Sequence, residues 1–116
     1  MQELHFKGKT IRFDSRGRGK PLFLIHGYLE SLEIWESFAS ELAEFYQVIR
    51  MDLPGHGKSE TIRDTHHMEM LAEAANEVLA QAGADRCTMI GHSLGGYVTL
   101  AFLDMFPDRL DGFALF

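Results

Sequence analysis

The spacing of hydrophobic residues divides the chain into an alternating start and a remainder built of short apolar runs. Near the start, Leu4 and Phe6 alternate with polar residues, and Ile11 and Phe13 do the same. Alternation of this kind is typical of strands that bury only one face. Because a turn-forming segment at 7–9 separates the two pairs, we expect an antiparallel hairpin that is packed on one side only.

Beyond residue 20 the pattern changes to continuous apolar runs, which predict strands buried on both faces of a parallel sheet. The continuous run covers residues 22–25, and three further buried strands are predicted at Val48, Ile49 and Met51, at residues 87–90 and at residues 113–116. Segments with helical spacing separate them, so strand and helix alternate along the chain. The predicted fold class is α/β, with a mostly parallel sheet, right-handed crossovers and an N-terminal antiparallel hairpin.

Three helices are expected between these strands. The first is capped by Ser31 and has an apolar stripe made of Trp35, Phe38, Leu42 and Phe45. The second ends before Gly83, and its apolar face consists of Met68, Leu71, Ala75, Val78, Leu79 and Ala82. The third runs from about Ser93 to Phe106 and is stopped by Pro107.

Composition and charge narrow the possible functions. With 116 residues, of which 46% are hydrophobic and 24% charged, the chain has the composition of one globular domain. Its net charge of −6 argues against nucleic-acid binding, and no apolar run is long enough to span a bilayer. We therefore expect neither a nucleic acid nor a membrane as a partner. The single Cys87 favours a reducing, cytoplasmic location, and we expect it to be a small buried hydrophobe.

The most informative motif lies where the third buried run meets the third helix. It has the form Gly-x-Ser-x-Gly and consists of Gly91, His92, Ser93, Leu94 and Gly95, followed by Gly96. This pattern forces a sharp strand-to-helix turn, with glycines where a side chain would collide with backbone. The turn raises Ser93 above the carboxyl end of the sheet, where a substrate can reach its hydroxyl. The positive end of the following helix favours an oxyanion there.

Taken with two further motifs, this turn resembles the α/β-hydrolase fold family, in the order and spacing of that family. His26, Gly27 and Tyr28 follow the first buried run, and the segment 52–59 follows the second. The resemblance covers the whole chain. It implies that residues 1–116 are the N-terminal part of a single α/β-hydrolase domain, with its first six strands and three helices. The C-terminal strands and the lid would then lie outside this sequence.

The resemblance also implies roles for particular residues. Ser93 is implied to be the nucleophile, and the backbone N–H groups of Tyr28 and Leu94 are implied to form the oxyanion hole. A donor of this kind lowers a barrier by about 3–4 kcal/mol. The resemblance further implies that six residues support the loop after the first buried run and the turn at Ser93: His26, Gly27, Gly91, His92, Gly95 and Gly96.

A complete catalytic triad in this family needs an acid and a histidine after the serine. No histidine follows Ser93, and the only carboxylates that follow it are Asp104, Asp108 and Asp111. The pattern places the first on the helix behind the turn and the other two at the amino end of the last strand. We therefore expect the triad acid and histidine to lie outside this chain. The fragment alone is expected to be inactive, because loss of the base costs on the order of 10⁶ in turnover.

Other candidate residues are expected to have structural roles. His56 lies in a Pro-Gly turn and is expected to form a loop hydrogen bond. His66 and His67 are adjacent, so on a helix they point about 100° apart and make a poor metal pair. Neither a metal nor a cofactor is expected. Three methionines, Met68, Met70 and Met89, are expected to fill the core rather than line a substrate pocket.

Three hypotheses about function remain. The main one is a serine hydrolase that acts on a small carboxylic ester, lactone or thioester through an acyl-enzyme on Ser93. A serine nucleophile disfavours the dehalogenase and epoxide-hydrolase branches of the family, but carbon–carbon bond hydrolases and cofactor-free haloperoxidases remain open. The third hypothesis is a catalytically incomplete module that forms a homodimer, or pairs with another fragment, through the exposed edge between Phe113 and Phe116.

Overall fold

The structure, a computed structural model, describes residues 1–62 and 67–116. Its centre is a six-stranded mixed sheet with the strand order β1-β2-β4-β3-β5-β6. The strands are β1 (Gln2–Phe6), β2 (Lys9–Arg16), β3 (Pro21–Ile25), β4 (Gln47–Met51), β5 (Cys87–Gly91) and β6 (Leu110–Leu115). The helices are α1 (Glu36–Leu42), α2 (Met68–Gln81) and α3 (Leu94–Met105), with short 3₁₀ turns η1 (Leu32–Trp35) and η2 (Pro107–Arg109).

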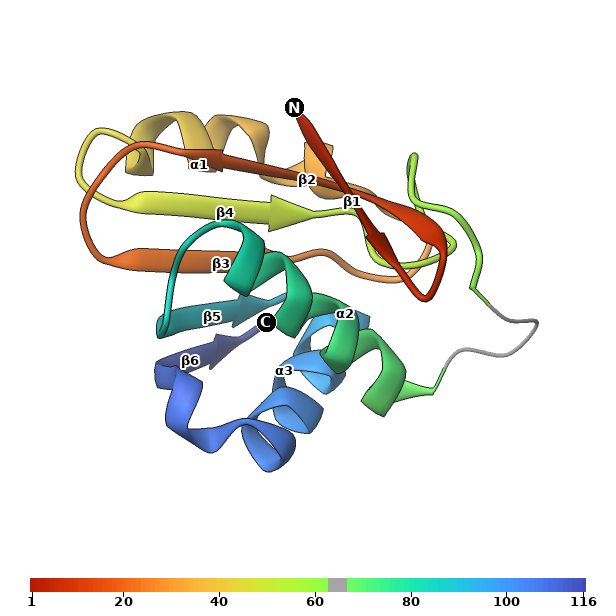
Figure 1. Cartoon of the computed structure of the whole chain (residues 1–116). Coiled ribbons are helices and arrows are strands. Elements are labelled where there is room, and N and C mark those ends of the chain that lie inside the picture. The colour runs from red at the N-terminus through yellow and green to blue at the C-terminus, as the bar shows by residue number, and fades with distance from the viewer. Residues whose placement is uncertain (63–66) are drawn as a thin grey trace.

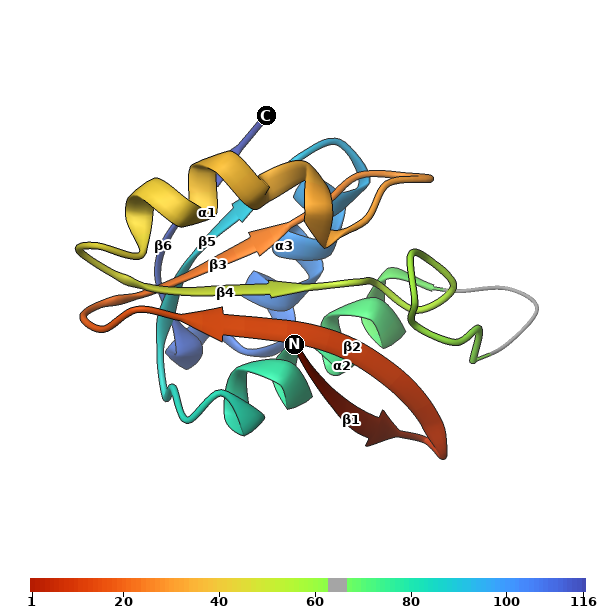
Figure 2. The same cartoon turned by 90° about the horizontal axis from the view of Figure 1, so that it is seen from above.

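Helices cover both faces of the sheet, with α1 on one side and α2 and α3 on the other (Figure 1 and Figure 2). Alternate residues of β3 face opposite layers, as a strand buried on both faces requires. Phe23 and Ile25 belong to the larger core beneath α2 and α3, whereas Leu24 packs in a smaller cluster with Ala39 of α1. The prediction of a central buried strand at 22–25 is therefore confirmed.

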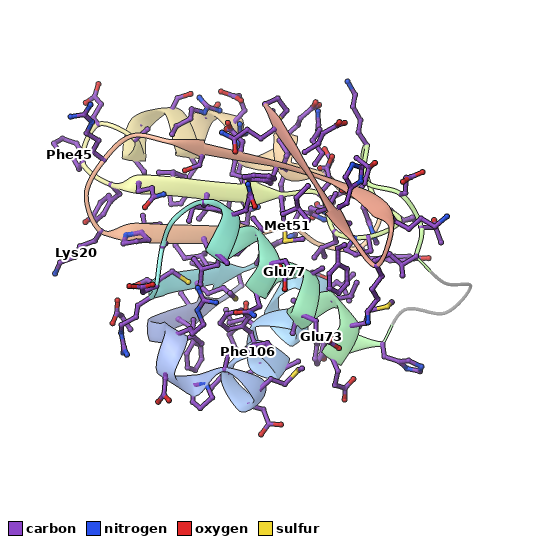
Figure 3. The ribbon with its side chains drawn as sticks, viewed as in Figure 1. Lys20, Phe45, Met51, Glu73, Glu77 and Phe106 are labelled. Carbon is purple, nitrogen blue, oxygen red and sulfur yellow. The ribbon has the colours of Figure 1, made fainter. Side chains whose placement is uncertain are left out.

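The polarity of the strands determines where the functional loops meet. Strand β3 pairs in parallel with β4 and β5, and β5 pairs in parallel with β6. The loops that follow β3, β4 and β5 therefore leave the sheet at one edge, which is on the right in Figure 1. Lys20 and Phe45, labelled in Figure 3, lie at the opposite edge.

The N-terminal hairpin is confirmed, but its packing differs from the prediction. Strands β1 and β2 are antiparallel and joined by a turn in which Lys7 and Gly8 have φ angles of +52° and +78°. The expectation of one buried face is wrong for β2, because Arg12 and Asp14 are buried as well as Ile11 and Phe13. These two charged residues are buried because each is ion-paired, Arg12 with Asp52 and Asp14 with Arg50.

The predicted helix around residue 38 is shorter than expected, and only part of its apolar stripe packs against the core. Ser31 does cap it, since its hydroxyl accepts a hydrogen bond from the N–H of Glu33 at 3.2 Å. A 3₁₀ turn then precedes α1, which changes the rotation of the residues that follow. Leu32 and Ala39 are buried, and Trp35 and Leu42 pack against the smaller cluster as predicted. The prediction is wrong for Phe38 and Phe45, which are 46% and 71% exposed, and Phe45 lies beyond the end of α1.

The last strand is present, but it is not buried as predicted. Strand β6 starts at Leu110, earlier than expected, so Asp111 belongs to the strand. Its only partner in the described sheet is β5, which makes it an edge strand. Phe113 and Leu115 are each 44% exposed, and Phe116 beyond the strand is 76% exposed.

Two expectations about the core are confirmed. Met70 and Met89 are buried in the larger core, and Met68 packs against it. Cys87 is fully buried, and burial raises the pKa of its thiol to about 12. A thiol with so high a pKa is protonated at neutral pH, which makes it a poor nucleophile. No helix in the described part of the chain combines the length and apolarity needed to cross a membrane.

Candidate active site

Ser93 sits on a strained turn between β5 and α3. Its φ and ψ angles are +55° and −115°, in a region that side-chain-bearing residues rarely adopt. Strain of this kind costs on the order of 1–3 kcal/mol and persists where surrounding contacts hold it. Here the Ser93 N–H donates to the carbonyl of Phe116 at 2.8 Å. The residue is exposed, and its hydroxyl has no hydrogen-bond partner among residues 1–62 and 67–116.

Two of the three glycines around Ser93 are required by close backbone approach. A Cβ atom on Gly91 would lie 2.3 Å from the carbonyl oxygen of Gly95. A Cβ atom on Gly95 would lie 2.2 Å from the carbonyl oxygen of Ile25, at the end of β3. The third, Gly96, has room for a side chain, since the nearest atom would be 3.7 Å away.

The N–H of Leu94 is oriented through the peptide that it shares with Ser93. That peptide is planar, so its C=O and N–H groups point in opposite directions. The Ser93 carbonyl accepts a hydrogen bond from the N–H of Gly96 at 2.8 Å, which fixes the plane. The Leu94 N–H has no acceptor in the described part of the chain and is free to bind a ligand oxygen.

The N–H of Tyr28 is oriented in the same way on the neighbouring loop. It shares a peptide plane with the carbonyl of Gly27, which accepts from His26 Nδ1 at 2.7 Å and from the Glu30 N–H at 3.2 Å. Within the described ranges the Tyr28 N–H donates to nothing. The turn is strained, because Leu29 has a φ of +60°.

His26 is fully buried, and both of its ring nitrogens are occupied. Nε2 accepts a hydrogen bond from the Leu53 N–H at 2.9 Å, so the ring proton must be on Nδ1, which donates to Gly27. Burial lowers the pKa of His26 below its ordinary value, and the ring stays neutral. With no free lone pair it is unsuited to act as a general base, and it links the two loops instead.

Asp52 anchors the segment 52–59 from inside the protein. Its carboxylate accepts hydrogen bonds from the N–H of Leu32, the N–H of Lys58 and the Nε of Arg12, at 2.7 to 2.8 Å. Ser59 adds to this anchor by donating to the Asp52 carbonyl at 2.7 Å. Sequence analysis matched the segment as a motif without finding this role, which depends on Arg12, 40 residues earlier.

Glu30 was also missed, and it joins the two strained turns. Its Oε1 atom accepts a hydrogen bond from the Gly27 N–H at 2.7 Å and lies 3.0 Å from His92 Nδ1. Desolvation raises the pKa of Glu30, but the bonds from Gly27 and His92 outweigh it and lower the pKa below its ordinary value. Nothing in the local sequence signals this contact, since it forms only when the two loops meet.

Three further titratable residues in the described ranges, none of which has a hydrogen bond to Ser93, are His56, His67 and Asp111. His56 has Nδ1 3.1 Å from the carbonyl of Pro54, in agreement with the expected loop hydrogen bond. His67 is exposed ahead of α2, and His66 lies outside the described residues. Asp111 pairs with Arg86 at 2.7 Å, at the amino end of β6. No cluster of metal-binding side chains occurs in the two described ranges.

Apolar surface borders the serine on two sides. One hollow of about 460 Å³ is lined by Ser93, Gly96, Tyr97, Leu100, Leu115 and Phe116. Another, of about 360 Å³, is lined by Ile34, Trp35, Phe38, His92 and Phe116. Both are open, and Phe116 separates them.

The order of these loops, on a mixed sheet with helices on both faces, is that of a known family. The family model described as the alpha/beta hydrolase fold matches residues 20–116. The chain belongs to this family. The three-dimensional structures are also closely similar. The structure of an enzyme described as degrading N-acyl homoserine lactones superposes on this chain with a TM-score of 0.95 at 26% sequence identity.

The relatives of this hydrolase-fold chain include hydrolases of several kinds. A pimeloyl-(acyl-carrier protein) methyl ester esterase of Pectobacterium carotovorum is 34% identical over 103 residues, which are 88% of this chain and 38% of that protein. A soluble epoxide hydrolase of a Corynebacterium species is 34% identical over 95 residues, 82% of this chain and 33% of that protein. The superposition on the lactone-degrading enzyme covers 98% of this chain and 44% of that enzyme. The chain therefore spans less than half the length of each.

Proposed function

We propose that this chain supplies the nucleophile and the oxyanion hole of a serine hydrolase that acts on small carboxylic esters, lactones or thioesters. The observation that supports it most strongly is the pair of unpaired, oriented N–H groups on Tyr28 and Leu94, on the two turns beside an exposed serine. Donors fixed in this way stabilise negative charge that develops only in the transition state.

The reaction follows from these positions. Ser93 Oγ attacks the carbonyl carbon, and the carbonyl oxygen gains a negative charge, to which the N–H groups of Tyr28 and Leu94 donate hydrogen bonds. The carbon–oxygen or carbon–sulfur bond then breaks, the leaving group takes up a proton, and an acyl-enzyme remains on Ser93. Water hydrolyses this ester and restores the hydroxyl. We propose that the base that moves these protons, and the carboxylate that orients it, come from residues outside these 116.

The relatives support an acyl-transfer reaction, although they do not define the substrate. One is named for a methyl ester and another for an acyl lactone, and both contain a carbonyl carbon bonded to an ester oxygen. A serine at the turn also fits carbon–carbon bond hydrolases and cofactor-free haloperoxidases, which would use the same nucleophile. We further propose a cytoplasmic location, for which the single buried Cys87 is the support, and which cell fractionation would test.

The test uses the full-length protein that contains this sequence and an activated ester such as p-nitrophenyl butyrate. We expect a burst of p-nitrophenol, a mass increase of one butyryl group, and the modification on the peptide that contains Ser93. Ser93→Ala should abolish all three. Ser37→Ala, at an exposed serine of α1, is the matched control and should leave them unchanged. A wild-type protein without a burst, or a burst that survives Ser93→Ala, would contradict the proposal.

The exposed edge of β6 supports a second proposal, that residues 1–116 expressed alone associate through this strand. Phe113, Leu115 and Phe116 are exposed there, and an unpaired strand edge with apolar side chains is prone to pair with another chain. Light scattering of the isolated fragment should give the mass of a dimer. Phe113→Lys should shift it to a monomer, whereas a wild-type fragment that is strictly monomeric would exclude this proposal.

A further inference from the structure

A single carboxylate connects the two turns that bear the candidate oxyanion donors. Glu30 follows Tyr28 by two residues, and its Oε1 atom receives the Gly27 N–H at 2.7 Å. The same atom lies 3.0 Å from Nδ1 of His92, the residue immediately before Ser93. Glu30 and His92 are 62 positions apart in the sequence, so this carboxylate contacts both turns.

The hydrogen bond from the Gly27 N–H to the Glu30 carboxylate helps to fix the backbone that precedes Tyr28. The peptide after Gly27 is held by His26 Nδ1 and the Glu30 N–H, both of which donate to the Gly27 carbonyl. The peptide before Gly27 is held by the Glu30 carboxylate, which accepts its N–H. Because both planes that flank the Gly27 Cα are held, its two backbone dihedrals have little freedom. The direction of the Tyr28 N–H is set by those dihedrals.

The contact is tightly packed and is charge-assisted. A Cβ atom on Gly27 would lie 2.6 Å from Glu30 Oε1 and 3.1 Å from His92 Nδ1, so the carboxylate fits against bare backbone. The carboxylate is ionised at neutral pH, and an ionised acceptor makes a hydrogen bond roughly twice as strong as a neutral one. His92 keeps the carboxylate over Gly27, since the side chain of Glu30 is only partly buried, with 31% exposed.

We propose that Glu30 is a positioning residue for the oxyanion hole: through Gly27 and His92 it holds the Tyr28 N–H in register with Ser93. This inference rests on the proposed serine hydrolase function. Glu30 does not touch the substrate and transfers no proton. Its effect is on the position of a donor, and a displacement of about 1 Å in such a group can cost on the order of 10²-fold in rate.

The kinetic test compares Glu30→Ala, Glu30→Gln and His92→Phe in the full-length protein. Glu30→Ala should lower kcat about 10- to 100-fold with KM within about twofold, because the oxyanion forms only after the substrate has bound. Glu30→Gln keeps an oxygen acceptor for the Gly27 N–H and should recover most of the activity. His92→Phe, which leaves that bond in place, should have an effect between the two. Glu41→Ala, at an exposed carboxylate of α1, is the matched control.

A transition-state analogue separates positioning from a purely structural role. A trifluoromethyl ketone adds to a serine hydroxyl and forms a hemiketal whose charged oxygen occupies the oxyanion position. Its affinity should fall in Glu30→Ala by the same factor as kcat/KM. A substitution that only destabilised the fold would lower the amount of active protein, but not the affinity or kcat of each folded molecule.

Amide hydrogen exchange at Gly27 keeps the inference testable whatever the activity. In the wild-type protein this N–H is bonded to Glu30, and in Glu30→Ala we expect it to exchange at least about tenfold faster. Unchanged exchange in Glu30→Ala, or unchanged kcat and analogue affinity in an active enzyme, would overturn the positioning role. If Ser93→Ala retained activity, the serine mechanism would fail instead. The exchange result would then decide whether Glu30 fixes the Gly27 backbone.

Discussion

The two turns at the carboxyl ends of the parallel strands each carry one candidate oxyanion donor, but different contacts hold the two turns in place. The turn at 91–95 is held mainly by backbone, through glycines that allow close approach and hydrogen bonds between main-chain groups. Two side-chain contacts add to this, from Thr99 Oγ1 to the Gly95 carbonyl at 2.8 Å and from His92 to Glu30 at 3.0 Å. The turn at 26–30 is held by side chains, with the ring of His26 and the carboxylate of Glu30 bonded to the backbone of Gly27. Among residues 1–62 and 67–116, each turn nevertheless has one N–H without an acceptor, that of Tyr28 or that of Leu94.

This difference decides what can disturb each turn. An added methyl group disrupts close steric contacts between backbone atoms, whereas pH and salt do not affect these contacts. Polar contacts from side chains respond to the loss of a charge, to protonation and to a partner far away in the sequence. The turn at 91–95 should therefore fail through added volume, and the turn at 26–30 through altered charge.

The largest effect is expected for Gly95→Ala, which adds volume to the backbone-held turn. The new Cβ would lie 2.2 Å from the carbonyl oxygen of Ile25 and 2.6 Å from that of His26. Backbone atoms of β3 have no room to move, so we expect a loss of about 4–5 kcal/mol, above the usual cost of overpacking. Urea unfolding of the full-length variant measures it. A loss below about 1 kcal/mol would show that the turn adapts and that its glycine is not sterically required.

The next effect is expected for Asp52→Ala, which removes the anchor of the segment 52–59, where the Leu53 N–H donates to His26 of the side-chain-held turn. The substitution removes the buried partner of the Arg12 guanidinium, which keeps the exposed Glu33 at 3.4 Å, and it removes the acceptor for two backbone N–H groups. Breaking a buried ion pair on one side costs about 3 kcal/mol or more. Asp104→Ala, at an exposed aspartate of α3, is the control and should stay within about 0.5 kcal/mol of wild type. Equal stability of the two variants would contradict the role of Asp52.

The same difference explains what could be predicted from the sequence. Gly91, Ser93 and Gly95 are close in the chain, so their spacing alone indicated the turn. Strands such as β3 were also predicted, because burial on both faces gives a continuous apolar run. By contrast Glu30 acquires its partner His92 only after folding, and Arg12 is buried only because Asp52 meets it. The predicted stripe succeeded for Trp35 and Leu42 but failed at Phe45, because α1 ends at Leu42 and Phe45 lies beyond it.

A smaller effect, dependent on pH, should come from His26. Burial lowers its pKa in the folded protein, and the ring of His56 with a centroid 5.1 Å away adds to that shift. The unfolded chain then binds a proton that the folded one does not, once the pH falls below about 6.5. Stability is therefore full above that pH and is lost as pH falls toward the folded pKa, by up to about 1.4 kcal/mol per pH unit.

Unfolding free energies of wild type and His26→Gln between pH 7.5 and 5 would measure this effect. We expect the two curves to converge as the pH falls, because only the wild type has the buried imidazole that must stay neutral. The difference in slope should persist in 0.5 M salt, since the main cause is desolvation and not a screened surface charge. Parallel curves would show that the side chain of His26 is no source of pH sensitivity in this turn.

The smallest change in stability is expected for Gly96→Ala, although the neighbouring substitution Gly95→Ala is expected to have the largest. At Gly96 a Cβ atom would find its nearest neighbour, the flexible end of Leu115, at 3.7 Å, which is ordinary van der Waals contact. Since alanine favours helix over glycine by about 1 kcal/mol, the variant should be as stable as wild type or more stable by up to that amount. Urea unfolding of both glycine variants under one set of conditions makes the comparison. If both variants lost stability equally, the close backbone approach at Gly95 would not distinguish it from Gly96, and the steric account of this turn would be wrong.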